Sequence, residues 1–202
     1  SSVLVQRGEF PFVFILGDLE EAGYFYHDLT QVLGTDKVLF FPSSFRRAIK
    51  YGQKDAANEI LRTEVLSRLQ KGEEGLCVVT YPDALAEKVV SRKELGDKTL
   101  KLHSGENVDT NFIMEVYEPG QYAVRGSIID VFSFSSEFPY RIDFFGDEVE
   151  SIRTFEVETQ LSKEKKDSIV IVPDLSRSLE QGGASGMVSF LDFLSADTVL
   201  AM

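Results

Sequence analysis

Apolar positions in the first 90 residues alternate between short continuous runs and stretches with helical spacing. Residues 12–16 form a continuous apolar run, which is typical of a strand covered on both faces. Apolar residues then recur every three or four positions, which predicts a helix that starts after Asp18 and ends at Gly34. The same alternation predicts further strands over 38–41 and 76–80 and further helices over 55–69 and 81–89.

Two of the predicted helices begin with the residue spacing of a capping box. Asp18 precedes Glu21 by three residues, and Thr80 precedes Asp83 by three residues. In such a box the first side chain accepts a hydrogen bond from a free backbone N–H of the first turn. We therefore expect Asp18 and Thr80 to begin these helices.

Strands that alternate with helices predict a parallel sheet built from right-handed crossovers, with helices on its faces. A nucleotide-binding fold of this α/β type holds phosphates at the turn after its first strand, with a glycine-rich loop and a helix N-terminus. Here residues 16–21 contain one glycine, no Lys-Ser/Thr pair and the three carboxylates of Asp18, Glu20 and Glu21, which repel a phosphate. The sequence predicts a P-loop-NTPase-like α/β domain that lacks its ATP site.

From about residue 98 the pattern changes to the alternation of antiparallel strands. We expect strands over 124–132, over 140–145 and after Gly146-Asp147, with turns between them. Because side chains alternate along a strand, Tyr140, Ile142 and Phe144 should face a core. Arg141, Asp143 and Phe145 should then face the other way.

A large aromatic beside a charged fork is more typical of a protein-binding surface than of a solvated sheet face. Arg125, which we expect on the neighbouring strand, would join Arg141 and Phe145 on that surface. The alternative is that Phe145 lies under a loop and both arginines pair with acidic residues of the same segment. The candidates for that pairing are Asp130, Asp143 and Asp147. The pattern alone does not decide between the two.

Composition narrows the classes of function. The chain has 202 residues, of which 43% are hydrophobic, so it can build one core or two small ones. A formal net charge of −12 argues against a protein whose main ligand is a nucleic-acid backbone. The single cysteine, Cys77, lies in an apolar run and is expected in the core. No segment reaches the ~18 apolar residues of a membrane span and no signal peptide opens the chain, so we expect a soluble, cytoplasmic protein.

Other candidate chemistry is weak. Neither His27 nor His103 has a nucleophile or ligand cluster at a useful spacing, so no catalytic residue is expected. Four carboxylates near the second turn allow a divalent-metal or acid/base interpretation, but solvated edge charges are favoured: Asp143, Asp147, Glu148 and Glu150. The densest basic group is interpreted as a solvated helix face, with weak DNA contact or docking as alternatives: Arg46, Arg47, Lys50 and Lys54.

Two long motifs, YAVRGSIIDVF at 122–132 and PYRIDFFGDEVESIRTFEVETQ at 139–160, carry a family resemblance. They resemble the N-terminal UvrB-like module of the bacterial transcription-repair coupling factors. Weaker likeness at 38–42, 78–80 and 169–173 extends the resemblance over nearly the whole chain. The segment 109–117 departs from the family, which has a longer helical segment there.

The resemblance implies a partner and its contact residues. Arg125, Arg141 and Phe145 fall on the family positions that contact UvrA, the excision-repair protein that the UvrB-like surface recruits. The family module has also lost the P-loop that UvrB carries, which agrees with the acidic turn at 16–21. The resemblance therefore implies a non-catalytic adaptor without a cofactor or metal. Its family places RNA polymerase binding, DNA binding and the ATP- and magnesium-dependent translocase in domains further along a longer protein.

Two other functions remain open at this point. The chain could be a divergent UvrB-like motor domain that binds ATP and damaged DNA, or its main role could be to pack against the rest of its own protein and mask the UvrA surface. The resemblance divides the chain into three parts: a degenerate NTPase-like domain 1a over 1–97, an inserted, small antiparallel α+β domain 2 that binds UvrA over 98–170, and a return segment that starts domain 1b over 171–202. That last segment contains a glycine-rich linker at 182–186 and a predicted final strand at 198–202.

Overall fold

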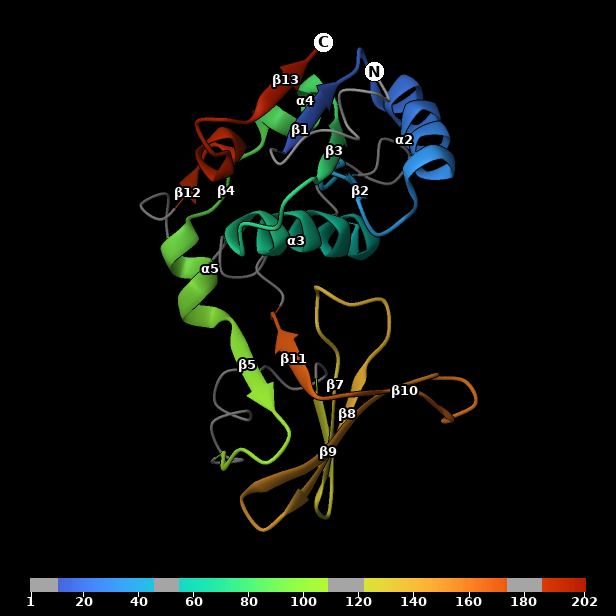
Figure 1. Ribbon diagram of the computed structural model, residues 1–202, viewed down its shortest axis with the longest axis vertical. Helices are drawn as coiled ribbons and strands as arrows, with labels where there is room; N and C mark the ends of the chain where they lie inside the picture. The colour runs from blue at the N-terminus through green and yellow to red at the C-terminus, as the bar shows by residue number, and fades with distance from the viewer. Residues whose placement is uncertain (1–10, 46–54, 109–121, 174–186) are drawn as a thin grey trace. The chain divides into compact units, whose positions relative to one another are not determined.

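The computed structural model describes residues 11–45, 55–108, 122–173 and 187–202, and it divides the chain into two compact units (Figure 1). Unit 1 comprises Ser1–Arg92 together with Ser178–Met202, and unit 2 comprises Lys93–Arg177. Unit 1 is therefore assembled from two separated stretches of chain, whereas unit 2 is continuous. The fold combines a parallel sheet with helices in unit 1 and antiparallel sheets in unit 2.

A four-stranded parallel sheet forms the centre of unit 1. Its strands run in the order β13-β1-β3-β2, and every neighbouring pair is parallel. Their bounds are β1 (Phe12–Ile15), β2 (Val38–Phe40), β3 (Cys77–Thr80) and β13 (Val199–Ala201). Val13 and Val78 in the central strands are fully buried, as is Cys77. The predicted parallel strands and the core position of Cys77 are thus confirmed.

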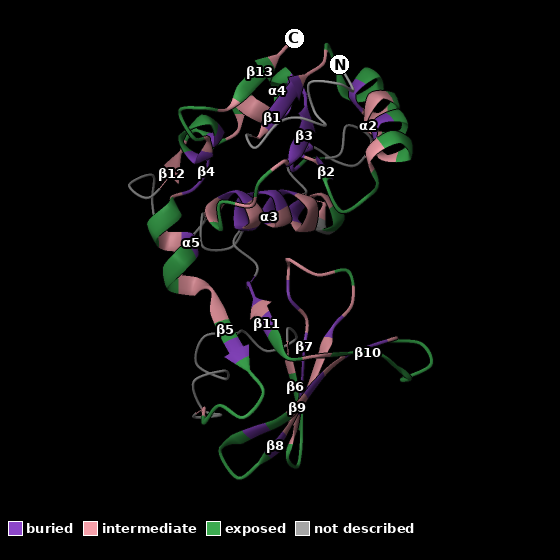
Figure 2. Ribbon diagram, viewed as in Figure 1, coloured by how far each residue is buried: buried purple, intermediate pink, exposed green. Residues whose placement is uncertain are grey.

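Helices α2 (Leu19–Leu33) and α3 (Ala56–Gln70) follow the first two strands, as the spacing of apolar residues predicts. α2 packs on the sheet through two aromatic contacts, Phe25 on Phe14 at 5.1 Å and Tyr26 on Phe40 at 5.3 Å between ring centroids. Figure 2 shows exposed and partly buried positions over most of α2, and buried and partly buried positions over most of α3. α2 therefore keeps a solvent-facing side, whereas α3 is enclosed along most of its length.

The predicted caps differ in outcome. Asp18 is the N-cap of α2, and its Oδ1 accepts hydrogen bonds from the amides of Glu20 and Glu21 at 2.9 Å each. Thr80 does not cap a helix, because it is buried at the end of β3 and its hydroxyl donates to the carbonyl of Phe41 at 2.9 Å. α4 (Pro82–Ala86) instead starts after Tyr81, with a proline in its first turn.

The short elements of unit 1 complete it. The helix expected up to residue 89 ends at Ala86, and β4 (Val89–Val90) follows and pairs antiparallel with β12 (Met187–Val188). Next comes the 3-10 helix η2 (Phe190–Phe193), whose Phe190 packs on Phe41 with ring centroids 4.3 Å apart. The two stretches of unit 1 therefore meet both in the sheet and in its core.

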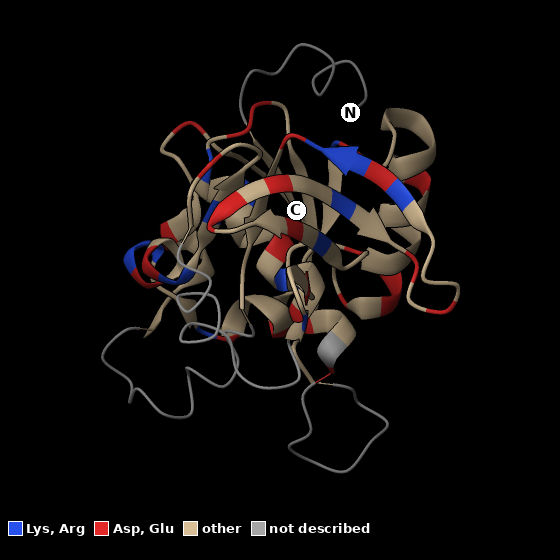
Figure 3. Ribbon diagram, turned by 90° about the horizontal axis from the view of Figure 1, so that it is seen from below, with Lys and Arg blue, Asp and Glu red and all other residues tan. Residues whose placement is uncertain are grey.

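Unit 2 contains a five-stranded antiparallel sheet in the order β10-β9-β8-β7-β6 and a two-stranded pair, β11-β5. Its elements are α5 (Arg92–Lys98) without its first residue, β5 (Leu100–His103), β6 (Tyr122–Arg125), β7 (Ile128–Val131), β8 (Tyr140–Phe145), β9 (Glu148–Phe155), β10 (Ser162–Lys166) and β11 (Ser168–Ile171). The predicted change to antiparallel structure and the strand at 140–145 are confirmed. Acidic and basic residues lie interspersed over the described strands and helices (Figure 3).

The stretch 124–132, predicted as one strand, is two strands. Gly126 has φ +64°, a conformation that side chains disfavour, and it turns the chain so that Arg125 pairs with Ile128. Arg125 therefore lies on β6 and is separated from β8 by β7, rather than lying on the strand next to β8. A glycine inside an alternating pattern marked this turn.

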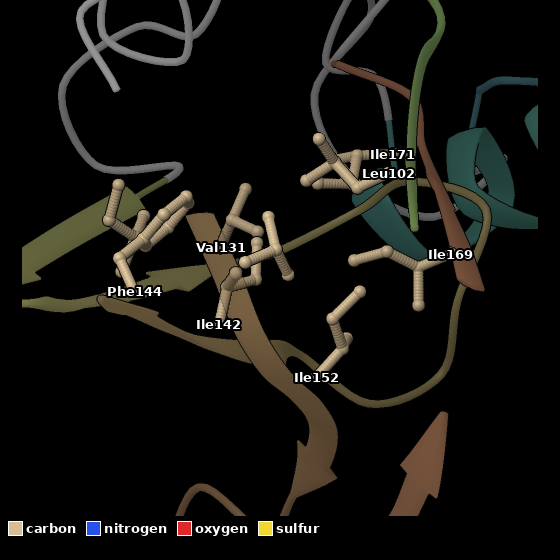
Figure 4. Packing of buried hydrophobic residues seen from close by; sticks show 9 residues of the cluster. Leu102, Val131, Ile142, Phe144, Ile152, Ile169 and Ile171 are labelled. Atoms are coloured by element: carbon tan, nitrogen blue, oxygen red, sulfur yellow. The ribbon is translucent and has the colours of Figure 1, made fainter. Parts of the chain in front are cut away.

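One face of the five-stranded sheet packs on the β5–β11 pair to form the core of unit 2. Ile142 and Ile152 in the sheet are fully buried, as is Leu102 on β5, and Ile169 on β11 is nearly so. Figure 4 shows these side chains converging from the sheet and from the strand pair. Phe144 is buried and Tyr140 packs partly buried against the cluster, so the predicted core face of β8 is confirmed.

Candidate protein-binding face of unit 2

The candidate site is the sheet face of unit 2 that points away from this core, which we call the outer face. Strand register brings its residues together: Asp130 on β7 pairs with Arg141 on β8, and Arg141 pairs with Arg153 on β9. Asp143 lies two residues further along β8 on the same face. The outer face therefore carries adjacent acidic and basic side chains across three strands.

Arg141 is held inside this face by several contacts. Its Nε donates to Oδ1 of Asp130 at 2.6 Å and its Nη2 to Oδ2 at 2.7 Å, which is a bidentate ion pair. Nη2 also donates to Oε1 of Gln160 at 2.9 Å, and the guanidinium carbon lies 4.2 Å from the ring centroid of Phe155. The hydrogen bond to Asp130 raises the pKa of Arg141, against the opposing effect of desolvation. With 13% of its side chain exposed, Arg141 is an internal brace of the sheet.

Arg125 reaches the same carboxylate far more loosely. Its Nη2 lies 3.9 Å from Oδ2 of Asp130, and 63% of its side chain is exposed. An exposed ion pair at this distance contributes little to stability. The internal pairing considered as an alternative therefore holds Arg141 firmly and Arg125 weakly.

Phe145 is exposed at the end of β8. Its exposed fraction is 78%, whereas that of the preceding residue, Phe144, is 5%. The turn that follows begins at Gly146, whose φ of +63° reverses the chain into β9. Phe145 is thus displayed beside a hairpin turn, and the alternative that it lies under a loop is wrong.

Arg153 on β9 forms a second ion pair that the sequence analysis did not single out. Its Nη1 donates to Oδ2 of Asp143, which also accepts from the hydroxyl of Ser151 at 2.6 Å. The signal available in the sequence was the register, which places β9 beside β8 with Arg153 next to Arg141 and near Asp143. Asp143 therefore belongs to an ion pair rather than to a paired-carboxylate site.

The turn between β9 and β10, residues 156–161, also borders the outer face. Gln160 has φ +59°, and its Nε2 donates to the carbonyl of Val157 at 2.7 Å while its Oε1 accepts from Arg141. Val157 and Leu161 are exposed by 61% and 68%. Sequence reasoning missed this turn, because two isolated apolar residues in a polar segment carry no periodic signal.

The turn after β1 in unit 1 is occupied by its own acidic side chains. The amide of Gly17 donates to Oε2 of Glu21 at 2.9 Å, and the amides of Glu20 and Glu21 donate to Asp18. A Cβ at Gly17 would lie 2.8 Å from that Glu21 oxygen. The amides that a phosphate would use at such a turn are thus hydrogen-bonded to carboxylates.

Among the described residues, no group of three or more His, Cys, Asp or Glu side chains is arranged to hold a metal ion. The basic group at Arg46, Arg47, Lys50 and Lys54, the departure at 109–117 and the linker at 182–186 lie outside the described residues, in whole or in part. No described helix combines the length and the apolar character needed to cross a bilayer.

Comparison with known proteins shows what these features are similar to. Residues 102–176, which contain the whole outer face, match the family described as UvrB interaction domain. The transcription-repair-coupling factor of Escherichia coli is 26% identical over 184 residues, covering 84% of this chain and 16% of that protein. The one from Bacillus subtilis is 28% identical over 219 residues, covering 98% of this chain and 18% of that protein.

A shorter match has a higher identity. The transcription-repair-coupling factor of Haemophilus influenzae is 48% identical over 61 residues, which is 30% of this chain and 5% of that protein. The chain spans less than a fifth of the length of the relatives it matches. The chain is therefore similar to the bacterial transcription-repair-coupling factors over most of its length, and residues 102–176 in unit 2 are similar to the UvrB interaction domain family.

Proposed function

We propose that this chain is a non-catalytic adaptor whose outer face in unit 2 binds UvrA, and that it thereby links a stalled RNA polymerase to nucleotide excision repair. The observation that carries the proposal is the display of Phe145, 78% exposed, on the same sheet as Arg125, 63% exposed, inside the matched domain. Both residues lie on strands of a hydrogen-bonded sheet, so they are held ready without large rearrangement.

The residue types support this function. An exposed aromatic ring supplies a large apolar area at a low cost in side-chain entropy, and arginine offers a planar fork of donors to a partner carboxylate. Arg125 keeps most of this fork accessible, because its only ion pair among the described residues is the 3.9 Å contact with Asp130. Phe145 and Arg125 are therefore the proposed direct contacts, with Arg141 supporting them.

We also propose that unit 1 is a P-loop-NTPase-like domain whose nucleotide site has been lost. The carboxylates of Asp18 and Glu21 hold the amides of the turn after β1, and their charge opposes a phosphate at that position. This argues against the competing function, a divergent motor domain that binds ATP and damaged DNA. Titration with a fluorescent ATP analogue tests the point, and micromolar binding to this chain would overturn it.

The activity of the longer relatives belongs to a larger protein than this chain. ATP-driven translocation, with its magnesium, and the contacts to RNA polymerase and DNA would lie in regions beyond the matched part, since the match covers 16% to 18% of the full-length relatives. Because the proposed partner works on chromosomal DNA, the location we propose is cytoplasmic. Masking of the outer face by those regions is compatible with this adaptor role.

Calorimetric titration of purified UvrA into this chain tests the proposal. We expect binding by the unmodified chain and a loss of about tenfold to thirtyfold in affinity for Phe145→Ala, which corresponds to roughly 1.4–2 kcal/mol. Arg125→Ala should weaken binding in the same direction. Melting curves should be unchanged for both, because neither side chain belongs to a core.

The matched control is Tyr24→Ala, which removes an exposed aromatic, 69% accessible, from α2 in unit 1. It should bind UvrA as tightly as the unmodified chain does. If Tyr24→Ala and Phe145→Ala weaken binding equally, the outer face is not the site. If the folded, unmodified chain does not bind at all, the adaptor role is refuted.

A further inference from the structure

Resting on the proposed function, we propose that the partner-binding surface extends to the turn at residues 156–161, where Val157 and Leu161 make further contacts. We propose in addition that Arg141 acts as a positioning residue that holds this turn in shape, without itself contacting the partner. The turn lies within the matched residues 102–176.

Arg141 has few hydrogen-bond donors left for a partner. Three of the five N–H donors of its guanidinium are used internally, two by Asp130 and one by Gln160. Its flat face is covered by the ring of Phe155 at 4.2 Å, and 13% of the side chain is exposed. Any effect of Arg141 on binding must therefore pass mainly through the groups that it holds.

Gln160, one of the groups that Arg141 holds, determines the shape of the turn. Gln160 adopts φ +59°, a conformation that costs a non-glycine residue energy unless its surroundings impose it. Its side-chain amide bridges Arg141 on β8 and the carbonyl of Val157 inside the turn. Gln160 is thus the link through which Arg141 fixes the turn to the sheet.

The turn at residues 156–161, fixed in this way, exposes apolar side chains. Backbone hydrogen bonds from Gln160 to Glu156 at 2.8 Å and from Glu156 to Leu161 at 2.9 Å close the turn. Val157 and Leu161 nevertheless remain 61% and 68% exposed. Two exposed apolar residues on a closed, braced turn are suited to burial against a partner.

Continuity with the proposed contacts identifies the occupant as the same partner. Gln160, Arg141, Asp130 and Arg125 form one connected series across the outer face, at 2.9, 2.7 and 3.9 Å. A partner that engages Arg125 and Phe145 at one end of this series is directed along it towards the turn at the other. The surface would then have an apolar anchor at each end and charged groups between them.

Two sets of measurements separate the parts of the inference. The first needs no partner: amide hydrogen exchange at Gln160 and Leu161 is compared between the unmodified chain and Arg141→Lys, which keeps the charge and loses the planar fork. Exchange in the turn should accelerate about tenfold or more, while exchange in the β8–β9 pairing at Ile142 and Ile152 stays nearly unchanged. Unchanged exchange in the turn would overturn the positioning role, whether or not UvrA binds.

The second set measures UvrA binding. Leu161→Ser should weaken it about tenfold, and Leu191→Ser, which replaces an exposed leucine in unit 1, should leave it unchanged. Gln160→Ala keeps the Arg141–Asp130 pair and should still weaken binding, although its melting curve is close to that of the unmodified chain. In the Leu161→Ser background, Arg141→Lys should cost much less than it does alone, because the contact that it positions is already lost.

The outcomes distinguish this inference from the proposed function. Normal binding by Leu161→Ser, with binding lost in Phe145→Ala, would refute the extended surface and leave the adaptor role in place. Fully additive effects of Arg141→Lys and Leu161→Ser would show that Arg141 contacts the partner directly. A folded chain that binds no UvrA would refute both the adaptor role and the extended surface, and hydrogen exchange alone would then decide whether Arg141 braces the turn.

Discussion

Arg125 and Arg141 share one carboxylate, Asp130, yet their surroundings give them different consequences for stability. Arg141 is 13% exposed and bidentate, whereas Arg125 is 63% exposed and 3.9 Å away. A largely buried ion pair that loses one partner leaves an unpaired buried charge, while an exposed pair contributes little. The two arginines therefore make a controlled comparison within one sheet.

We predict that Arg141→Ala lowers the free energy of unfolding by about 2–3 kcal/mol, because Asp130 would stay buried without its partner. Arg125→Ala should change it by less than about 0.5 kcal/mol. Urea denaturation of both variants measures the difference. Equal stability of the two variants would contradict the assignment of Arg141 as the internal brace.

The buried thiol of Cys77 predicts a pH dependence of stability. Burial raises the pKa of its thiol from 9.0 to about 11, with Lys37 acting weakly in the opposite direction. Between these values the folded state keeps a proton that the unfolded state has lost, so this contribution to stability is present below pH 9 and is lost as the pH rises towards 11.

The expected result is that the unmodified chain loses stability between pH 9 and 11 more steeply than Cys77→Ala does. Denaturation at several pH values compares the slopes, so the lower baseline of the variant does not matter. A thiol reagent at pH 8 should also leave folded Cys77 unmodified, because the side chain is fully buried. Identical slopes, or rapid labelling of the folded chain, would count against this account.

At the scale of elements, two glycines differ in whether their backbone conformation requires glycine. Gly126 turns β6 into β7 with φ +64°, whereas Gly23 lies inside α2, where an added Cβ would meet no atom within 4 Å outside the helix's own backbone. Alanine is strained in the first conformation and favoured in the second. The same substitution should therefore have opposite effects at the two positions.

We predict that Gly126→Ala destabilises the chain by about 1 kcal/mol and that Gly23→Ala stabilises it by about 0.5–1 kcal/mol. Thermal or urea unfolding with a probe in each unit measures both. Destabilisation by Gly23→Ala would mean that its open surroundings are needed, and a neutral Gly126→Ala would show that the β6–β7 turn tolerates another conformation.

These elements also show what sequence reasoning could and could not supply. The strands of the parallel sheet and the helices α2 and α3 followed from the sequence pattern, since a buried strand or an amphipathic helix leaves a regular pattern, whereas the short strands β4 and β12 did not. Gly126 was read as part of a strand because the residues on either side alternate, so a two-residue turn did not interrupt the pattern. The exposure of Arg141 and Phe145 could be predicted only in part. Alternation along the strand placed both side chains on the same face. The pairing of Arg141 with Asp130 on β7 and its contact with Gln160 across a turn, which show that Arg141 is the one held internally, appear only in the structure.

At the scale of the whole molecule, the two units differ in how the chain builds them. Unit 2 is continuous and contains its own core, formed by the sheet and the β5–β11 pair. Unit 1 depends on its second stretch, because β13 pairs with β1 and Phe190 packs on Phe41. Continuity should therefore decide which part can be excised.

We predict that residues 93–177 alone fold cooperatively, with a single thermal transition and dispersed amide resonances. Residues 1–92 alone should not, since they lack β13 and η2. Adding residues 178–202 as a separate peptide should restore structure to that part. A cooperative transition in residues 1–92 alone would show that the second stretch is dispensable.

The split construction of unit 1 has a consequence for how the chain folds as it is synthesised. Phe12 pairs with Val199, so the β1–β13 contact cannot form until residue 199 has left the ribosome. All of unit 2 is synthesised before residue 199 and can complete its core first, while the edge of β1 that pairs with β13 has no partner strand. Translation itself thus sets an order, and the outer face of unit 2 exists before unit 1 is closed.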